Sequence, residues 1–301
     1  MTGREKRPPC PYCGSDKAVI RYGRCHGKRQ MYYCKVCKRK FVPNDGVGSR
    51  KGAHVVALAL DLYFRGLSLR KVSDHLANAY GIYVHYTTIY KWIKRYVRLI
   101  SEFVNVLDLN FSGTWYADEM SIKVGGRWRW LWNVMDGETR FLIASIITSD
   151  RETEDAIRVL REAYLTAGRK PEVVITDGLH AYREAIKKVF GSLRRGGPRH
   201  IRHVRWEGDI APTNIIERLQ GTVREREKVM RGLKTEGTMI IEGFRIHYNF
   251  ARPHEGLNGR TPAEAAGQDY FGKGKEAWLK LLLESVIWRE LNKHSSKTGI
   301  N

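Results

Sequence analysis

The sequence predicts an α/β protein whose largest domain is built on a mixed sheet and is preceded by two smaller modules. Two Cys-x2-Cys pairs open the chain, apolar residues at helical spacing follow them, and after Gly113 the apolar period changes to that of strands. A chain of 301 residues can bury one full-sized core and still carry small appended modules. We expect four segments, at residues 1–45, 52–107, 112–235 and 236–301.

The charge balance is strongly basic. Lys and Arg number 53 against 32 Asp and Glu, which gives a formal net charge of +21. Residues 1–51 alone hold 14 basic and 3 acidic residues. Clustered basic residues are typical of proteins that neutralise nucleic-acid phosphates, and the alternative is a merely soluble basic surface. We expect double-stranded DNA as the partner.

No targeting or membrane segment is predicted. The chain begins Met1-Thr2-Gly3-Arg4, without the apolar segment of a signal peptide, and no apolar run approaches the ~18 residues of a membrane span. We therefore expect a cytoplasmic protein that binds no membrane and is associated with the nucleoid.

The cysteines predict a structural zinc site. The two Cys-x2-Cys pairs are separated by twenty residues, a spacing typical of zinc ribbons. The expected ligands are Cys10, Cys13, Cys34 and Cys37. The intervening AVIRYG and QMYYC are predicted to be short strands, and one Zn²⁺ would supply the folding energy that so short a segment lacks. Cys25, beside His26, is interpreted as a spare cysteine rather than a ligand.

Three helices are predicted between residues 53 and 98. Apolar residues recur at helical spacing in VVALALDLYF, SLRKVSDHLANAY and TTIYKWIKRYV. Ser68 and Thr87 are expected N-caps, and Gly66 and Gly81 are expected helix stops.

Three such helices with short turns suit a helix-turn-helix module. The candidate DNA-contacting residues on its last helix are Thr88, Tyr90, Lys91, Lys94 and Arg95. Trp92, Ile93 and Tyr96 would face the core of the module. The alternative is a helical hairpin with a solvated basic face, and the neighbouring cysteine pairs and the charge favour DNA binding.

The third segment shows three strands followed by alternating helices and strands. The strands are expected at residues 114–124, 127–137, 139–148, 171–178 and 200–206, and the helices at 152–167, at 180–190 and from about 213. This order is that of a ribonuclease H-like fold.

Three acids in this segment are the candidate catalytic residues. Asp118 lies on the first strand, Asp177 at the end of the fourth, and Glu217 one turn into the last helix, so all three could meet at one edge. Phosphodiester transfer needs one oxygen activated and another stabilised, which two metals ~3.5–4 Å apart achieve. Mg²⁺ is held by a few carboxylates together with the substrate phosphate.

Other residues compete for or support this site. Glu119 is a rival acid that points to the opposite face from Asp118 if the strand is regular, and Asp209 is a rival in a loop. Arg224 follows Glu217 by seven residues, two helical turns, and could bind a DNA phosphate beside the metals. The alternative for Arg224 is a solvated helix charge.

Taken together these motifs resemble the DDE transposases of bacterial and archaeal insertion sequences, most closely the insertion-sequence-six family. The resemblance runs from about Lys51 to Gly267 and is carried by YFRGLSLRKVSDHL, TTIYKWIKRY, YADEMSIKVGGRWRWLWNVMD, VVITDGLHAY and NIIERLQGTVRERE. The chain departs from the family in the 39 residues between Asp177 and Glu217, somewhat more than is usual, and in carrying the cysteine module.

The resemblance implies a function and the residues that perform it. Asp118, Asp177 and Glu217 would be the acid triad holding two Mg²⁺ or Mn²⁺ ions, with Arg224 as the basic residue that follows it. The helix-turn-helix would recognise terminal inverted repeats, and the chain would act as a homo-oligomer, at least a dimer. The expected activity is DNA cleavage and strand transfer. The alternatives are a domesticated DNA-binding regulator and a structure-selective nuclease of ribonuclease H type.

Overall fold

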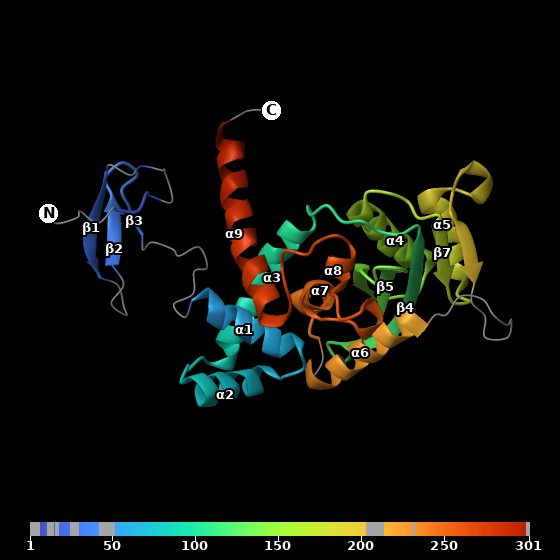
Figure 1. The fold of residues 1–301 in the computed structure, drawn as a ribbon, viewed down its shortest axis with the longest axis horizontal. Coiled ribbons are helices and arrows are strands. Elements are labelled where there is room, and N and C mark those ends of the chain that lie inside the picture. Colours follow the sequence, from blue (N-terminus) through green and yellow to red (C-terminus); the bar gives the residue numbers. More distant parts are fainter. Residues whose placement is uncertain are drawn as a thin grey trace. The chain divides into compact units, whose positions relative to one another are not determined.

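The computed structural model describes residues 7–10, 15, 18–24, 30–41, 52–202, 214–230 and 233–298. The chain forms two compact units, residues 1–52 and residues 53–301, and each is described by itself (Figure 1). Within the described residues no helix has the length and apolar character to span a lipid bilayer. The finer division into four segments stays a prediction.

The first unit is built around a small antiparallel sheet. Its strands are β1 Val19–Arg24, β2 Gln30–Cys34 and β3 Arg39–Phe41, in the order β1-β2-β3. The two predicted strands are confirmed, and β3 is an addition. Val19, Phe41 and two of the cysteines, Cys10 and Cys34, form its small buried core.

The second unit begins with three helices, as predicted. They are α1 Ala53–Phe64, α2 Leu69–Tyr80 and α3 Tyr86–Val104. Ser68 caps α2, because its side chain accepts a hydrogen bond from the backbone N–H of Lys71 at 3.3 Å. Gly81 ends α2 in the left-handed conformation, with φ of 61°, which glycine adopts without strain.

One predicted cap is wrong. α3 begins at Tyr86, so Thr87 lies inside the helix rather than before it. The N-cap is His85, whose Nδ1 accepts from the backbone N–H of Thr87 at 3.5 Å. An imidazole nitrogen can serve as the capping acceptor in place of a hydroxyl, and the sequence search for Ser, Thr, Asp or Asn passes over it.

A mixed five-stranded sheet follows, with helices on both faces (Figure 1). In chain order the elements are β4 Thr114–Val124, β5 Arg127–Asp136, β6 Leu142–Thr148, α4 Thr153–Ala167, β7 Val173–Thr176, α5 His180–Phe190, β8 Arg199–Arg202 and α6 Asn214–Met230. The strand order is β6-β5-β4-β7-β8, antiparallel among the first three and parallel from β4 to β8. This is the predicted ribonuclease H-like fold.

The central strand β4 is covered on both faces, and alternate residues face different helices. Trp115 meets Phe190 of α5, with ring centroids 6.0 Å apart, and Glu119 bonds Tyr182 of the same helix. Asp118 faces the other way, toward Gln220 of α6. The period-two alternation of a strand therefore sends neighbouring acids to two different helices.

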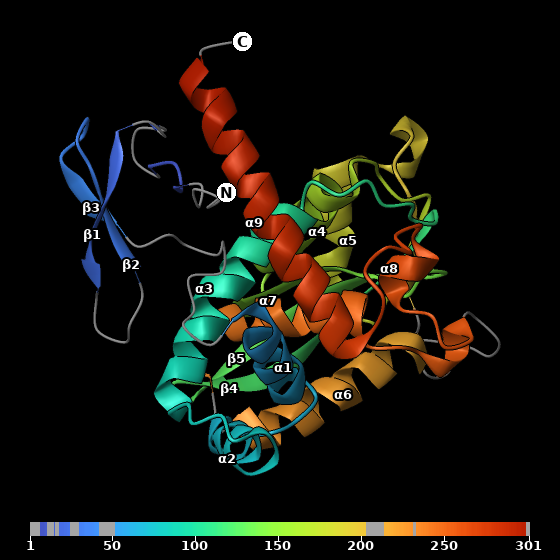
Figure 2. The ribbon, with the colours of Figure 1, turned by 60° about the vertical axis from the view of Figure 1, so that its left-hand side comes forward.

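The C-terminal part packs on α1 and α3 of this unit. Its elements are α7 Met239–Ile246, a π-helical turn at His247–Ala251, α8 Pro262–Ala265 and α9 Gly274–Thr298. Helices α1 and α3 both contact α9, and α3 also contacts α7 (Figure 2). Thr261 and Glu264 form a capping box at the start of α8.

Two close contacts fix this arrangement. Gly243 of α7 lies so near Phe64 of α1 that a Cβ there would come within 2.2 Å of the ring, so glycine is required for the approach. Asn249 pairs with the edge strand β6, because its side chain accepts from the N–H of Leu142 at 2.8 Å and donates to the carbonyl of Leu142 at 2.9 Å. The helices thereby bind directly to the sheet.

Candidate active site

The structure brings Asp118 and Asp177 together through strand pairing. Ala117 of β4 pairs in parallel with Thr176 of β7, so the next residue on each strand is an aspartate at the same level of the sheet. One oxygen from each of Asp118, Glu119 and Asp177 lies within 4.8 Å of the others. Three carboxylates thus converge at the end of β7.

Asp118 is held from two sides. Its Oδ1 accepts from the backbone N–H of Glu119 at 2.9 Å, and its Oδ2 accepts from the side-chain amide of Gln220 at 2.6 Å. Burial, the charge of Glu119 and the charge of Asp177 raise the pKa of Asp118 to about 7. A carboxyl group in this state favours a bound cation, which would stabilise its ionised form.

Glu119 faces a different helix from Asp118, as a regular strand requires, yet its carboxylate still belongs to the acid cluster. One of its oxygens accepts from the Tyr182 hydroxyl at 2.9 Å, and the other accepts from Arg151 at 2.7 Å. Burial raises the pKa of Glu119. Arg151 also lies 3.6 Å from Asp177, so its guanidinium joins two of the three acids.

Glu217 lies beside this cluster but outside the group of three. It is exposed in the first turn of α6, and its charge contributes to the raised pKa of Asp118. Gln220, three residues along the same helix, donates to Asp118 and so fixes α6 against β4. The rival Asp209 lies outside the described residues.

The candidate DNA-binding residues are largely solvent-accessible. Arg224 is exposed on α6, two turns beyond Glu217. On α3 the exposed members of the predicted set are Lys91, Lys94 and Arg95, and the half-buried members are Thr88 and Tyr90. The residues expected to face the core, Trp92, Ile93 and Tyr96, are all buried.

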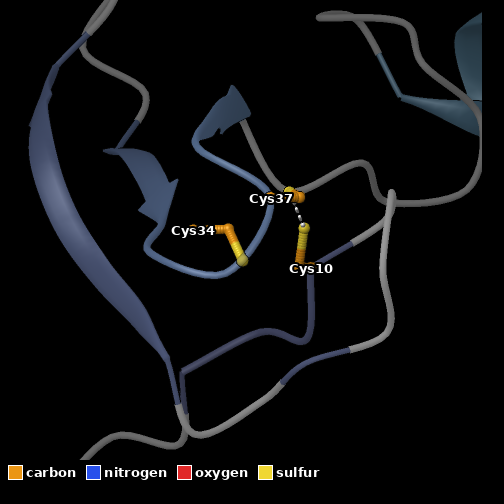
Figure 3. A group of neighbouring side chains, drawn as sticks. All are labelled: Cys10, Cys34 and Cys37. Carbon is orange, nitrogen blue, oxygen red and sulfur yellow. Dashed lines mark hydrogen bonds between the residues drawn. The ribbon is translucent and has the colours of Figure 1, made fainter.

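Three of the four predicted zinc ligands converge in the first unit. The sulfur atoms of Cys10, Cys34 and Cys37 lie within 4.8 Å of one another (Figure 3). The Cys10 and Cys37 sulfurs are 3.5 Å apart, close to the ~3.7 Å edge of a tetrahedron with Zn–S bonds of about 2.3 Å. Cys13 and Cys25 lie outside the described residues. The geometry fits a thiolate-held zinc.

Three residues that donate hydrogen bonds to the acid cluster were not predicted from the sequence. Gln220 could have been found, because a residue three positions after Glu217 lies on the same side of a helix. Arg151 lies in the segment between β6 and α4, and Tyr182 lies in the first turn of α5. Their approach to Glu119 depends on how the helices pack, which no local spacing reveals.

Comparison with known proteins identifies the family of this domain. The family model of a DDE domain, that of IS240-type transposases, matches residues 112–254. The transposase for insertion sequence element IS257 in transposon Tn4003 of Staphylococcus aureus is 28% identical over 141 residues, which is 46% of this chain and 62% of that protein. The transposase for the insertion sequence-like element IS431mec of Staphylococcus aureus strain N315 gives the same identity and coverage. This chain thus spans a little under two thirds of the length of these curated relatives.

Among solved structures, the catalytic core domain of the HTLV-2 integrase in complex with magnesium is similar, with a TM-score of 0.39 and 13% identity over 53% of this chain and 98% of that one. The simian T-cell lymphotropic virus intasome in complex with PP2A regulatory subunit B56 gamma gives a TM-score of 0.41 and 13% identity, over 71% of this chain and 76% of that one. Residues 112–254 match the DDE domain family, and over part of its length the chain is similar to transposases of insertion sequences.

Proposed function

We propose that this protein binds the terminal inverted repeats of an insertion sequence and cuts and joins DNA ends by metal-dependent, in-line phosphodiester chemistry. The observation that carries the proposal is the meeting of Asp118 and Asp177 at one edge of the sheet, inside a DDE domain, with Glu217 on the helix beside them. The partners would be element ends and target DNA, and the active form at least a dimer.

The residues present fit a pair of Mg²⁺ or Mn²⁺ ions. Asp118, Asp177 and Glu217 would hold them, since hard cations prefer carboxylate oxygens. Glu119 is the weaker candidate, because one of its oxygens accepts from the charged Arg151 guanidinium and the other from Tyr182, whereas Asp118 accepts only from neutral N–H groups. When bound, the ions would activate the attacking oxygen and stabilise the leaving one.

The chain's own side chains would position the acids and the DNA. Gln220 holds the Asp118 carboxylate toward the cluster, and the backbone N–H of Leu179 does the same for Asp177, at 3.0 Å from its Oδ1. Arg224, exposed beyond Glu217, would bind a phosphate of the DNA strand. The helix-turn-helix and a zinc ribbon would hold the end sequence while the reaction proceeds. A protein that binds element ends in this way would be located on chromosomal DNA in the cell.

The test is a reaction of the intact chain with a linear duplex that ends in the inverted repeat of its own element, in Mg²⁺. The proposal expects a nick that leaves a 3′-hydroxyl at the repeat, followed by joining of that strand to a second duplex. Cleavage of any branched DNA without joining would favour the nuclease alternative. Specific binding with neither cleavage nor joining, in Mg²⁺ or Mn²⁺, would favour the regulator.

Metal binding should depend on pH in a defined direction. Because the pKa of Asp118 is raised to about 7, a proton occupies its carboxylate at lower pH and must leave when a metal binds. We expect the affinity for Mn²⁺, measured by titration calorimetry, to fall about tenfold for each pH unit below about 7 as one proton is released. Equal affinity at pH 6 and pH 8 would contradict this, and Asp118→Asn should weaken binding and flatten the pH dependence.

Specificity and chemistry should separate on substitution. Replacing Lys94 or Arg95 on α3 by Ala should cost ~1–3 kcal/mol of discrimination between the true end and a scrambled duplex, if that side chain reads a base. Arg224→Ala should instead slow the reaction and leave the discrimination intact. Competition binding at several salt concentrations measures the first effect, since phosphate contacts vary steeply with salt. Unchanged specificity after substitution of Lys91, Lys94 and Arg95 together would assign end recognition to the cysteine module.

A further inference from the structure

Arg226 of α6 is a buried charge whose guanidinium nitrogens have no partner at good hydrogen-bond geometry among the described residues. It is 4% exposed, and all three of its guanidinium nitrogens are buried. Its Cζ lies 4.3 Å from the centroid of the Tyr63 ring on α1, so the ring and the hydroxyl of Tyr63 stabilise the charge in part, while burial lowers the pKa of Arg226. A guanidinium carries five N–H donors, and leaving them unmatched in the interior is costly.

This guanidinium borders a cavity of about 440 Å³ between α1, α6 and the segment after α7. Two further arginines line it: Arg65, which is paired with Asp61 at 2.8 Å, and Arg252, which donates to the Thr222 hydroxyl at 3.1 Å. The acidic lining residue, Glu225, is exposed. The lining is therefore positive and suits an anion.

A second buried polar group faces the same cavity without a partner. His247 is 5% exposed, and its Nδ1 has no hydrogen bond within the described residues. Its ring stacks with Phe64 and with Trp278, at centroid distances of 6.3 and 6.4 Å. Burial and the surrounding arginines lower the pKa of His247 to about 3, so the ring is neutral and can donate one N–H.

We propose that this cavity binds a phosphate group of the DNA backbone, with Arg226 as the principal ligand and His247 and Arg252 beside it. The fork of a guanidinium matches two phosphate oxygens, and a bound phosphate would satisfy the donors that the fold leaves unmatched. That the phosphate belongs to DNA rests on the proposed function. Its position supports this source, because Arg65 and Gly66 of the lining lie in the turn between the first two helices of the DNA-binding module.

The site is distinct from the acid cluster although both use α6. Nine residues separate Glu217 from Arg226, which places them on opposite sides of the helix and about 13.5 Å apart along its axis. A phosphate on Arg226 therefore does not lie at the metals. It would instead connect DNA held by the helical module to the helix that carries Glu217.

The first experiment uses inorganic phosphate as the probe and the thermal unfolding of the full chain as the readout, without divalent metal. Phosphate should raise the Tm of the wild type, and Arg226→Met should reduce the apparent phosphate affinity at least tenfold. In phosphate-free buffer the variant should be as stable as the wild type or more stable, because methionine removes an unmatched buried charge. Arg161→Met, an exposed position on α4, is the matched control and should respond to phosphate as the wild type does.

Three results would overturn the proposal. Phosphate affinity that is equal in wild type and Arg226→Met excludes the site. A lower Tm of Arg226→Met in phosphate-free buffer makes Arg226 a structural residue. If Arg226→Met does not fold, Arg226→Lys is used instead, because it keeps the charge but loses the two-pronged guanidinium. Unchanged phosphate affinity in Arg226→Lys would also exclude the site.

The second experiment identifies the source of the phosphate. With a short duplex, Arg226→Met should bind more weakly at low salt and reduce the slope of log affinity against log salt by about 1. Phosphate binding that depends on Arg226, with duplex binding and salt slope unchanged, would indicate a free anion and refute the DNA assignment. Neither experiment requires DNA cleavage, so failure of the phosphate-site proposal is distinguishable from failure of the proposed transposase activity.

Discussion

Replacing Asp118 or Asp177 by Asn, or Glu217 by Gln, should reduce DNA cleavage and strand transfer more than ~100-fold, since losing even an outer-shell partner of a metal ligand costs ~10–100-fold. Each substitution removes a charged oxygen that would hold a metal ion, while the surfaces expected to hold DNA are untouched. Binding to end DNA should therefore stay within a few-fold of the wild type. The measurement is a strand-transfer assay in Mg²⁺ beside a binding assay without metal.

The matched control for this series is Glu184→Gln. Glu184 is an exposed acid on α5 that pairs with Lys187 and lies outside the acid cluster. Its substitution should leave both assays unchanged. Strand transfer that persists at wild-type level in any one of the three variants would remove that acid from the site.

Replacing Cys10 and Cys13 together by Ser should unfold residues 1–45 while the second unit keeps its structure. The sulfurs of Cys10, Cys34 and Cys37 already converge, and a zinc held by thiolates contributes ~10–16 kcal/mol of folding free energy in small metal-dependent modules. The intact chain should contain one zinc by metal analysis. Limited proteolysis should then cut the variant within its first 45 residues and spare the unit that begins at Ala53.

The control for the cysteine pair is Cys25→Ser, since Cys25 stands outside both Cys-x2-Cys pairs. This variant should retain its zinc and resist proteolysis as the wild type does. The hypothesis fails if the purified wild-type chain contains no zinc, or if the paired substitution leaves the zinc content unchanged.

Much of the fold could be predicted because its elements are encoded by local patterns. The strand β4 and the helix α5 begin and end where the sequence predicted, since a Gly125-Gly126 turn ends β4 and the period of the apolar residues changes from two to 3.6 at α5. Ser68 and Gly81 act where predicted because caps use local chemistry.

The misses have a common physical cause, which is contact between distant parts of the chain. Glu119 was expected to point away from Asp118, and it does bond a different helix. Its carboxylate nevertheless lies in the acid cluster, because Asp177 comes after the last residue of β7 and its carboxylate lies near both Asp118 and Glu119. The packing of α1, α6 and the C-terminal helices buries the unmatched polar groups of Arg226 and His247 and brings them to one cavity, so no local sequence pattern predicts them. In sequence, Arg226 is one more charge on a basic helix.

Two acids compete to be the third metal ligand, because Glu119 lies in the cluster and Glu217 lies beside it. Anomalous diffraction from crystals of the protein soaked in Mn²⁺ locates the ion directly. We expect manganese bound by Asp118, Asp177 and Glu217, with Glu119 still bonded to Tyr182. Manganese coordinated by Glu119 with Glu217 turned away, or no manganese at these acids at saturating concentration, would contradict this expectation.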